Sequence, residues 1–100
     1  ACHFRMLVYG PCMNPRIIIA DHAYEVATKL DAGEYMIIDS RDGSVNRIRN
    51  NGSAVDEFDN RNKKVSIFEK IPKGGSLVSW DGSFGFDIVI FYERGEPKWN

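Results

Sequence analysis

The sequence carries almost no net charge. Its 13 lysines and arginines are nearly balanced by 14 aspartates and glutamates, which leaves a formal net charge of -1. A chain this close to neutral has no overall positive field that would attract it to the phosphate backbone of a nucleic acid. Any contact with RNA or DNA would therefore depend on a local cluster of basic side chains.

Long apolar runs are also absent. One of the longest, at 88–92, has five residues, whereas a membrane-spanning helix needs roughly 20. A run of this length is typical of a buried β-strand. We therefore expect no membrane as a partner.

Metal-ligating residues are scarce. The chain has two cysteines and two histidines, and their spacings match no zinc-binding pattern. It also has no glycine-rich phosphate loop and no nucleophile-elbow motif. The sequence therefore predicts neither a metal centre nor a bound cofactor.

The two cysteines flank a turn-forming pair. Cys2 and Cys12 lie on either side of Gly10-Pro11, so the chain can turn back between them, and in an oxidising compartment they can pair. A chain that begins with Ala1 is what removal of a signal peptide leaves. We predict a Cys2–Cys12 disulfide in a secreted protein, and the alternative is a pair of reduced thiols in a cytosolic one.

The stretch 14–33 has the pattern of an amphipathic helix. Asn14 suits an N-cap, Pro15 suits the first helical position, and Gly33 suits the C-terminal stop. Between them, apolar residues recur at spacings of three and four: Ile17, Ala20, Ala23, Tyr24, Ala27 and Leu30. The sequence therefore predicts one helix of about four turns.

The rest of the chain favours short β-strands. These are expected at 4–9, 35–38, 45–48, 65–69, 77–80 and 86–92, with turn-forming residues after most of them. An N-terminal amphipathic helix packed on an antiparallel sheet is an α+β fold. No repeat, low-complexity tract or linker divides the chain, so residues 1–100 are expected to form a single domain.

A motif in the C-terminal third points to a family. Phe68-Glu69 is followed, with Gly82 thirteen residues after the glutamate, by the stretch 82–91. This resembles the fungal guanyl-specific ribonucleases, in which an aromatic-Glu pair precedes Gly-Ser-Pro-Gly-Ala-Asp-Arg-Val-Val-Phe at the same spacing. The shared residues are Glu69, Gly82, Ser83, Gly85, Asp87, Val89 and Phe91. The resemblance implies the microbial ribonuclease fold, one helix packed on an antiparallel sheet.

The family's catalytic residues are mostly missing. The resemblance makes Glu69 the general base, but the family's arginine position is Ile88, which carries no charge. The first family histidine falls in the stretch 48–50, Ile-Arg-Asn, and the second lies beyond Asn100. Loss of one general acid costs about 10²–10⁴ in rate, and loss of a charge-stabilising donor about as much again. We therefore expect no enzyme: Glu69 is a remnant, and the structural residues are Gly82, Gly85 and Asp87, the last as a semi-buried acceptor of backbone hydrogen bonds.

A secreted scaffold of this kind without its catalytic groups resembles the ribonuclease-like effectors that powdery mildew fungi deliver into cereal cells. The resemblance implies a monomeric virulence effector inside the host cell, with host proteins, among them a plant immune receptor, as partners and with weak RNA binding. The expected binding residues are Arg47, Arg49, Arg61, Lys63, Lys64 and Trp99, whereas Trp80 is expected in the core. Two alternatives stay open: an active guanyl-preferring ribonuclease that depends on Glu69, and a small secreted inhibitor of hydrolases.

Overall fold

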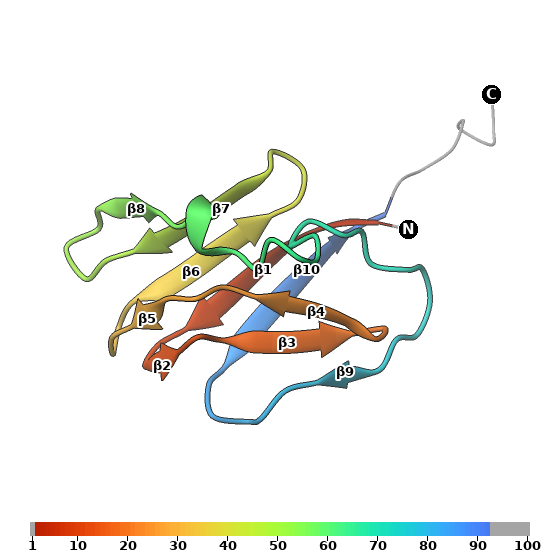
Figure 1. The fold of residues 1–100 in the computed structure, drawn as a ribbon, viewed down its shortest axis with the longest axis horizontal. Helices are drawn as coiled ribbons and strands as arrows, with labels where there is room; N and C mark the ends of the chain where they lie inside the picture. The colour runs from red at the N-terminus through yellow and green to blue at the C-terminus, as the bar shows by residue number, and fades with distance from the viewer. Residues whose placement is uncertain (1, 93–100) are drawn as a thin grey trace.

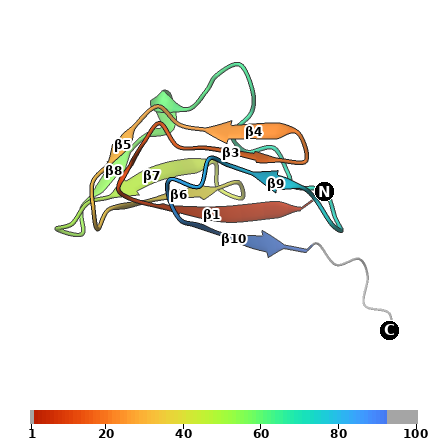
Figure 2. The same cartoon turned by 90° about the horizontal axis from the view of Figure 1, so that it is seen from below.

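The computed structural model describes residues 2–92, which fold into two packed layers of β-strands (Figures 1 and 2). One 3-10 turn, η1 (Phe58–Asn60), interrupts the strands. The strands are β1 (His3–Tyr9), β2 (Cys12–Met13), β3 (Arg16–Ile19), β4 (His22–Glu25), β5 (Lys29–Leu30), β6 (Tyr35–Asp39), β7 (Ser44–Ile48), β8 (Ala54–Asp56), β9 (Val78–Ser79) and β10 (Phe86–Phe91).

The larger layer is an antiparallel sheet of five strands in the order β10-β1-β6-β7-β8. In β1 the buried residues Phe4, Met6 and Val8 alternate with residues that are half-buried or exposed, because successive side chains of a strand point to opposite faces. Met6 pairs with Ile38 of β6 and with Ile88 of β10. The apolar rows of the inner face therefore continue across the sheet.

The smaller layer has the strand order β4-β3-β9, and a short ladder of β2 and β5 adjoins it. Ile17 and Ile19 of β3 and Tyr24 of β4 are buried, and the Tyr24 ring packs edge-on against Phe4 with 5.3 Å between centroids. The core therefore lies between the two layers that Figure 2 shows in profile. Its other buried apolar residues are Val26, Leu30, Met36, Val45, Ile67 and Ile71.

The predicted α+β fold is wrong, because the described residues contain no α-helix and the stretch 14–33 forms strands β3, β4 and β5. Three consecutive isoleucines, 17–19, are stiff β-branched residues that pack well on a pleated surface. Ala20 and Asp21 follow with positive φ angles of 50° and 66°, the conformation of a tight hairpin turn. Of the six apolar residues with helical spacing, only Ile17, Tyr24 and Leu30 are buried, whereas Ala20 and Ala27 are exposed, so the spacing does not mark one buried face.

Five of the six predicted strands are present with slightly different ends, but the expected strand at 65–69 is not. Two of its backbone carbonyl groups bond to side chains rather than to a neighbouring strand. His22 Nε2 lies 2.6 Å from the backbone oxygen of Ser66, and the Tyr24 hydroxyl donates to the backbone oxygen of Glu69 at 2.6 Å. Ile67, only 2% exposed, joins the core between these two anchors. This segment is thus a loop that contributes one core residue.

Candidate binding site

A cleft of about 340 Å³ opens beside β3 and β9. This volume lies at the lower end of the roughly 300–1,000 Å³ found for small-ligand sites. Half of the cleft's lining residues are aromatic or aliphatic and half are polar or charged, which is a more polar lining than small-ligand sites commonly have. Its lining residues are Met13, Asn14, Arg16, Ile18, Ser79, Trp80, Asp81 and Phe84.

A tight turn brings the two aromatic residues of the cleft together. Trp80 follows β9 directly, and the chain reaches Phe84 after three more residues. The backbone N–H and the hydroxyl of Ser83 both donate to Oδ1 of Asp81, at 2.9 and 2.7 Å, which closes the turn. Gly82 occupies the left-handed region at φ 79°, which glycine tolerates without strain and most residues do not.

The indole of Trp80 is held in place while much of it stays exposed. Its Nε1–H donates to the backbone oxygen of Phe84 at 2.9 Å. The ring also packs edge-on against Phe86 of β10, with 4.9 Å between centroids. Even so, 44% of the residue remains accessible to solvent. The expectation that Trp80 packs in the core is therefore wrong.

The charges at the rim of this cleft are balanced. Hydrogen bonds from the Ser83 hydroxyl and N–H lower the pKa of Asp81, so its carboxylate is ionised at neutral pH. Arg16 supplies one positive charge on a side chain that is 55% exposed, and its Nε lies 4.0 Å from a carboxylate oxygen of Glu25, which does not line the cleft. Two neutral polar residues, Asn14 and Ser79, complete the rim. The cleft thus offers hydrogen-bond donors and acceptors without a net charge.

Arg47 was expected to bind RNA, but it lies inside a buried ion cluster. Its Nε donates to Glu57 at 2.8 Å, and its Nη1 donates to Glu34 at 3.2 Å. Glu34 and Glu57 are only 7% and 4% exposed. Thr28 and Asn60 also donate to Glu57. Two carboxylates already more than offset the charge of Arg47, so its guanidinium stabilises the fold and is poorly suited to bind a phosphate.

The same cluster lowers the pKa of both carboxyl groups. For Glu34, the backbone N–H of Asp31 and then the charge and hydrogen bonds of Arg47 outweigh the effect of burial, so its pKa falls. For Glu57, burial acts to raise the pKa, but hydrogen bonds from Arg47, Asn60 and Thr28 together exceed it, and the pKa lies below its ordinary value. Both carboxylates are therefore ionised at neutral pH, as the ion cluster requires.

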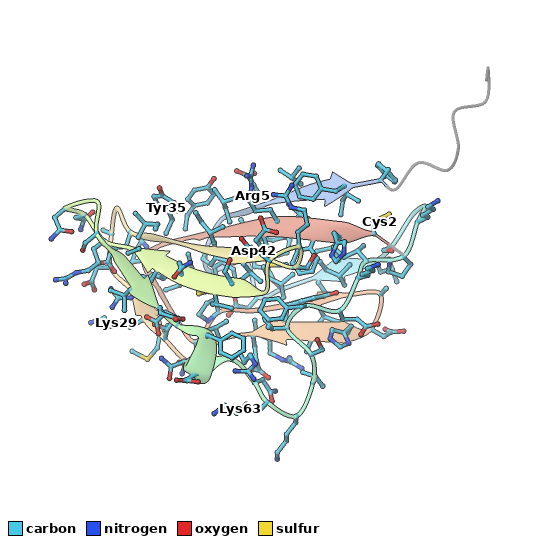
Figure 3. The ribbon with its side chains drawn as sticks, turned by 90° about the horizontal axis from the view of Figure 1, so that it is seen from above. Cys2, Arg5, Lys29, Tyr35, Asp42 and Lys63 are labelled. Carbon is cyan, nitrogen blue, oxygen red and sulfur yellow. The ribbon has the colours of Figure 1, made fainter. Side chains whose placement is uncertain are left out.

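The other basic residues expected to bind do not line the cleft beside β3 and β9, which we call the Trp80 cleft. The Arg61 guanidinium lies 3.7 Å from the centre of the Phe58 ring and donates to the Phe58 oxygen at 2.7 Å. Arg49 is exposed just after β7, and Lys63 and Lys64 are exposed on the loop after η1, where Figure 3 shows Lys63 projecting from the ribbon. Trp99, also expected to bind, lies outside the described residues.

The residues taken from the ribonuclease motif do not meet in one site. Glu69 and Ile88 line two different hollows. Asp87 is exposed, and its Oδ2 accepts a hydrogen bond from the Tyr9 hydroxyl at 2.7 Å. This corrects the expectation of a semi-buried carboxylate bonded to the backbone. Gly85 accepts the backbone N–H of Tyr9 at 2.9 Å, which joins the turn before β10 to the end of β1.

The expected disulfide is not formed, because Cys2 and Cys12 are both unbonded. They lie beyond opposite ends of β1, whose seven residues at about 3.3 Å each separate them by roughly 20 Å. A disulfide needs Cα atoms within about 7 Å of each other. Among residues 2–92, no group of three or more His, Cys, Asp or Glu side chains could hold a metal ion, and no helix is long and apolar enough to cross a membrane.

No protein-family model, curated protein or solved structure matches this chain. The resemblance to guanyl-specific ribonucleases therefore rests on the stretch 68–91 alone, because the helix that completed the template is absent. The Trp80 cleft did leave a signal in the sequence. Trp80 and Phe84 flank an Asp-Gly-Ser turn, which is visible in the sequence, and both residues line the cleft.

Proposed function

We propose that this chain is a non-catalytic binding module and that the Trp80 cleft binds a neutral sugar. The observation that carries the proposal is that the indole of Trp80 is held by internal contacts and is still partly exposed to solvent. Its N–H is already bonded to Phe84, its ring packs nearly perpendicular to that of Phe86, and 44% of the residue stays exposed, so a ligand meets an aromatic side chain that is already fixed. A fixed aromatic surface binds by stacking and apolar contact, and it loses little conformational freedom when it does so.

The polar rim of the cleft supports a sugar in particular. A sugar ring presents C–H groups on its flat faces and hydroxyl groups around its edge, and each hydroxyl both donates and accepts hydrogen bonds. The ring face can stack on Trp80, while Arg16, Asn14 and Ser79 donate and Asp81 accepts. Polar groups at fixed positions in the lining are the usual means by which a cleft orients a ligand.

The same arrangement argues against phosphate-containing ligands at this cleft. Arg16 is the one cation in its lining, and the carboxylate of Asp81 would repel a phosphate. Binding of nucleic acid draws most of its affinity from several lysines or arginines that neutralise phosphates together. The cleft therefore favours an uncharged ligand.

The proposal is tested by screening the purified protein against immobilised neutral and acidic glycans and titrating the best binder by calorimetry. We expect Trp80→Ala to weaken binding at least about tenfold, or about 1.4 kcal/mol, because the stacking surface is lost. Tyr92→Ala is the matched control, since it removes an aromatic side chain that is 66% exposed and lies outside the cleft. Absence of glycan binding, or equal affinity of the Trp80→Ala variant, would reject the proposal.

That the chain is a secreted effector without catalysis and binds host proteins stays a prediction. The two alternatives, an active guanyl-preferring ribonuclease and a small secreted inhibitor of hydrolases, also stay predictions. Anisotropy of an end-labelled guanine-containing RNA tests the ribonuclease alternative and the predicted RNA binding, and a panel of hydrolases tests the inhibitor alternative. A signal that decays below the value of free RNA would indicate cleavage, and Glu69→Ala should then abolish it. A stable rise that weakens with salt would indicate phosphate contacts without turnover.

A further inference from the structure

The strand β10 is an edge without a neighbour. It pairs with β1 on one side, and no strand among residues 2–92 pairs with its other side. Natural edge strands are usually protected by lysines, prolines, bulges or shortness. The other edge, β8, has only three residues, whereas β10 has six and contains no lysine, proline or glycine. Unpaired N–H and C=O groups along such a strand form a template for a further strand.

An apolar cleft of about 220 Å³ lies beside this edge, between the two layers. From β10 it is lined by Ile88 and Ile90, and from the smaller layer by Ile19 and Val78. Two apolar residues around it are strongly exposed, Leu77 at 86% and Tyr92 at 66%. The same side of the sandwich therefore leaves both backbone groups and apolar side chains uncovered.

In place of the monomer expected from the sequence, we propose that a second copy of this chain covers the edge, by antiparallel pairing of the two β10 strands around a twofold axis perpendicular to the sheet. Such pairing keeps both inner faces on one side, so residues of the same face stand opposite each other. Two registers pair most of the strand, one centred on Ile88 and one on Val89. In both, Ile88 stands opposite Ile88 or Ile90 of the partner, and the two apolar clefts adjoin.

The charge pattern of β10 fits this self-pairing. Asp87 is the one charged residue of the strand. Like charges directly opposite each other destabilise a strand pair. With Ile88 on the axis Asp87 stands opposite Val89, and with Val89 on the axis it stands opposite Phe91. Neither register brings Asp87 against its own copy, so the strand is compatible with itself.

The substitution Val89→Glu tests this pairing without weakening the single chain. Val89 is 38% exposed on the outer face and stands opposite Arg5 of β1. The Nε of Arg5 is buried and has no hydrogen-bond partner, so a glutamate there gains a cation within its own chain. Figure 3 shows Arg5 on the side of the larger sheet that is turned away from β3 and β4. In the dimer, however, the introduced glutamate faces Asp87 or its own copy, depending on the register, and either contact is repulsive.

Sedimentation velocity between about 1 μM and about 1 mM protein measures the association. We expect the wild type to form a dimer with increasing concentration and Val89→Glu to weaken that association at least tenfold. Ala54→Glu is the matched control, because it adds the same charge to the opposite edge strand and should dimerise like the wild type. The double variant Asp87→Lys, Val89→Glu identifies the register, since it should dimerise when position 89 faces position 87 of the partner and not when position 89 faces its own copy.

Three outcomes would overturn the proposal. The wild type could remain a monomer throughout the range. The Val89→Glu variant could dimerise like the wild type, which would place the interface elsewhere. Hydrogen exchange could show every β10 amide protected in a monomer, which would assign the edge to residues 93–100 of the same chain.

Discussion

Arginine and tryptophan are both enriched at binding sites, yet Arg47 and Trp80 have opposite roles in this molecule. Arg47 is enclosed by Glu34 and Glu57, and its charge is balanced inside the fold. Trp80 has its one polar atom bonded internally and keeps almost half of its surface exposed. The comparison teaches that residue type alone does not indicate a binding site. What matters is the surface and the hydrogen-bonding capacity that folding leaves unused.

The largest expected effect comes from breaking the buried side of this comparison. Arg47→Met should destabilise the protein by about 3 kcal/mol, because it leaves two buried carboxylates without their cation. Urea unfolding monitored by circular dichroism gives the change in the free energy of unfolding. The triple variant Glu34→Gln, Arg47→Met, Glu57→Gln removes all three charges and should recover most of the loss. If Arg47→Met is as stable as the wild type, the cluster does not hold the fold together.

The pH dependence of the free energy of unfolding should further distinguish the wild type from the Arg47→Met variant. In the wild type the folded pKa values of Glu34 and Glu57 lie below their ordinary value of 4.5, so their contribution is complete above that pH and is lost as the pH falls through the lower, folded values. In Arg47→Met, Glu57 loses the largest of the hydrogen bonds that offset its burial, so its pKa rises, whereas the Asp31 N–H still lowers the pKa of Glu34. Thermal unfolding at a series of pH values should therefore show a smaller loss of stability in acid for Arg47→Met than for the wild type, and parallel slopes would contradict this account.

The strands could be predicted where one face of a sheet is buried, because alternation along β1 and β6 and the turns after them are local signals. The stretch 14–33 could not, because its apolar residues fit helical and strand periods alike. What decides between them is the partner strands, and β9, which pairs with Ile18 and Ile19, lies some sixty residues away. The strand predicted at 65–69 was wrong for a related reason. The side chains of His22 and Tyr24 bond to carbonyl groups of this segment, in the place of a neighbouring strand.

The site was harder to predict than the strands. Arg47 reads as a free cation in the sequence, because the two carboxylates that enclose it are 10 and 13 residues away and meet it only in the folded sheet. Trp80 reads as a core residue because large aromatic residues usually are. It is exposed because β9 has only two residues and lies at the edge of its sheet, which no local pattern reveals.

The smallest expected effect concerns the exposed basic loop. Lys63→Ala with Lys64→Ala should change the free energy of unfolding by no more than about 0.5 kcal/mol, because both side chains are exposed and surface substitutions away from special features cost little. Affinity for a sugar at the Trp80 cleft should also stay unchanged, since neither lysine lines it. The informative measurement for the double variant is its affinity for RNA at a series of salt concentrations. If the loop contacts phosphates, the salt dependence of RNA affinity should become shallower by up to about two phosphate contacts, and an unchanged slope would remove these lysines from the set of candidate binding residues.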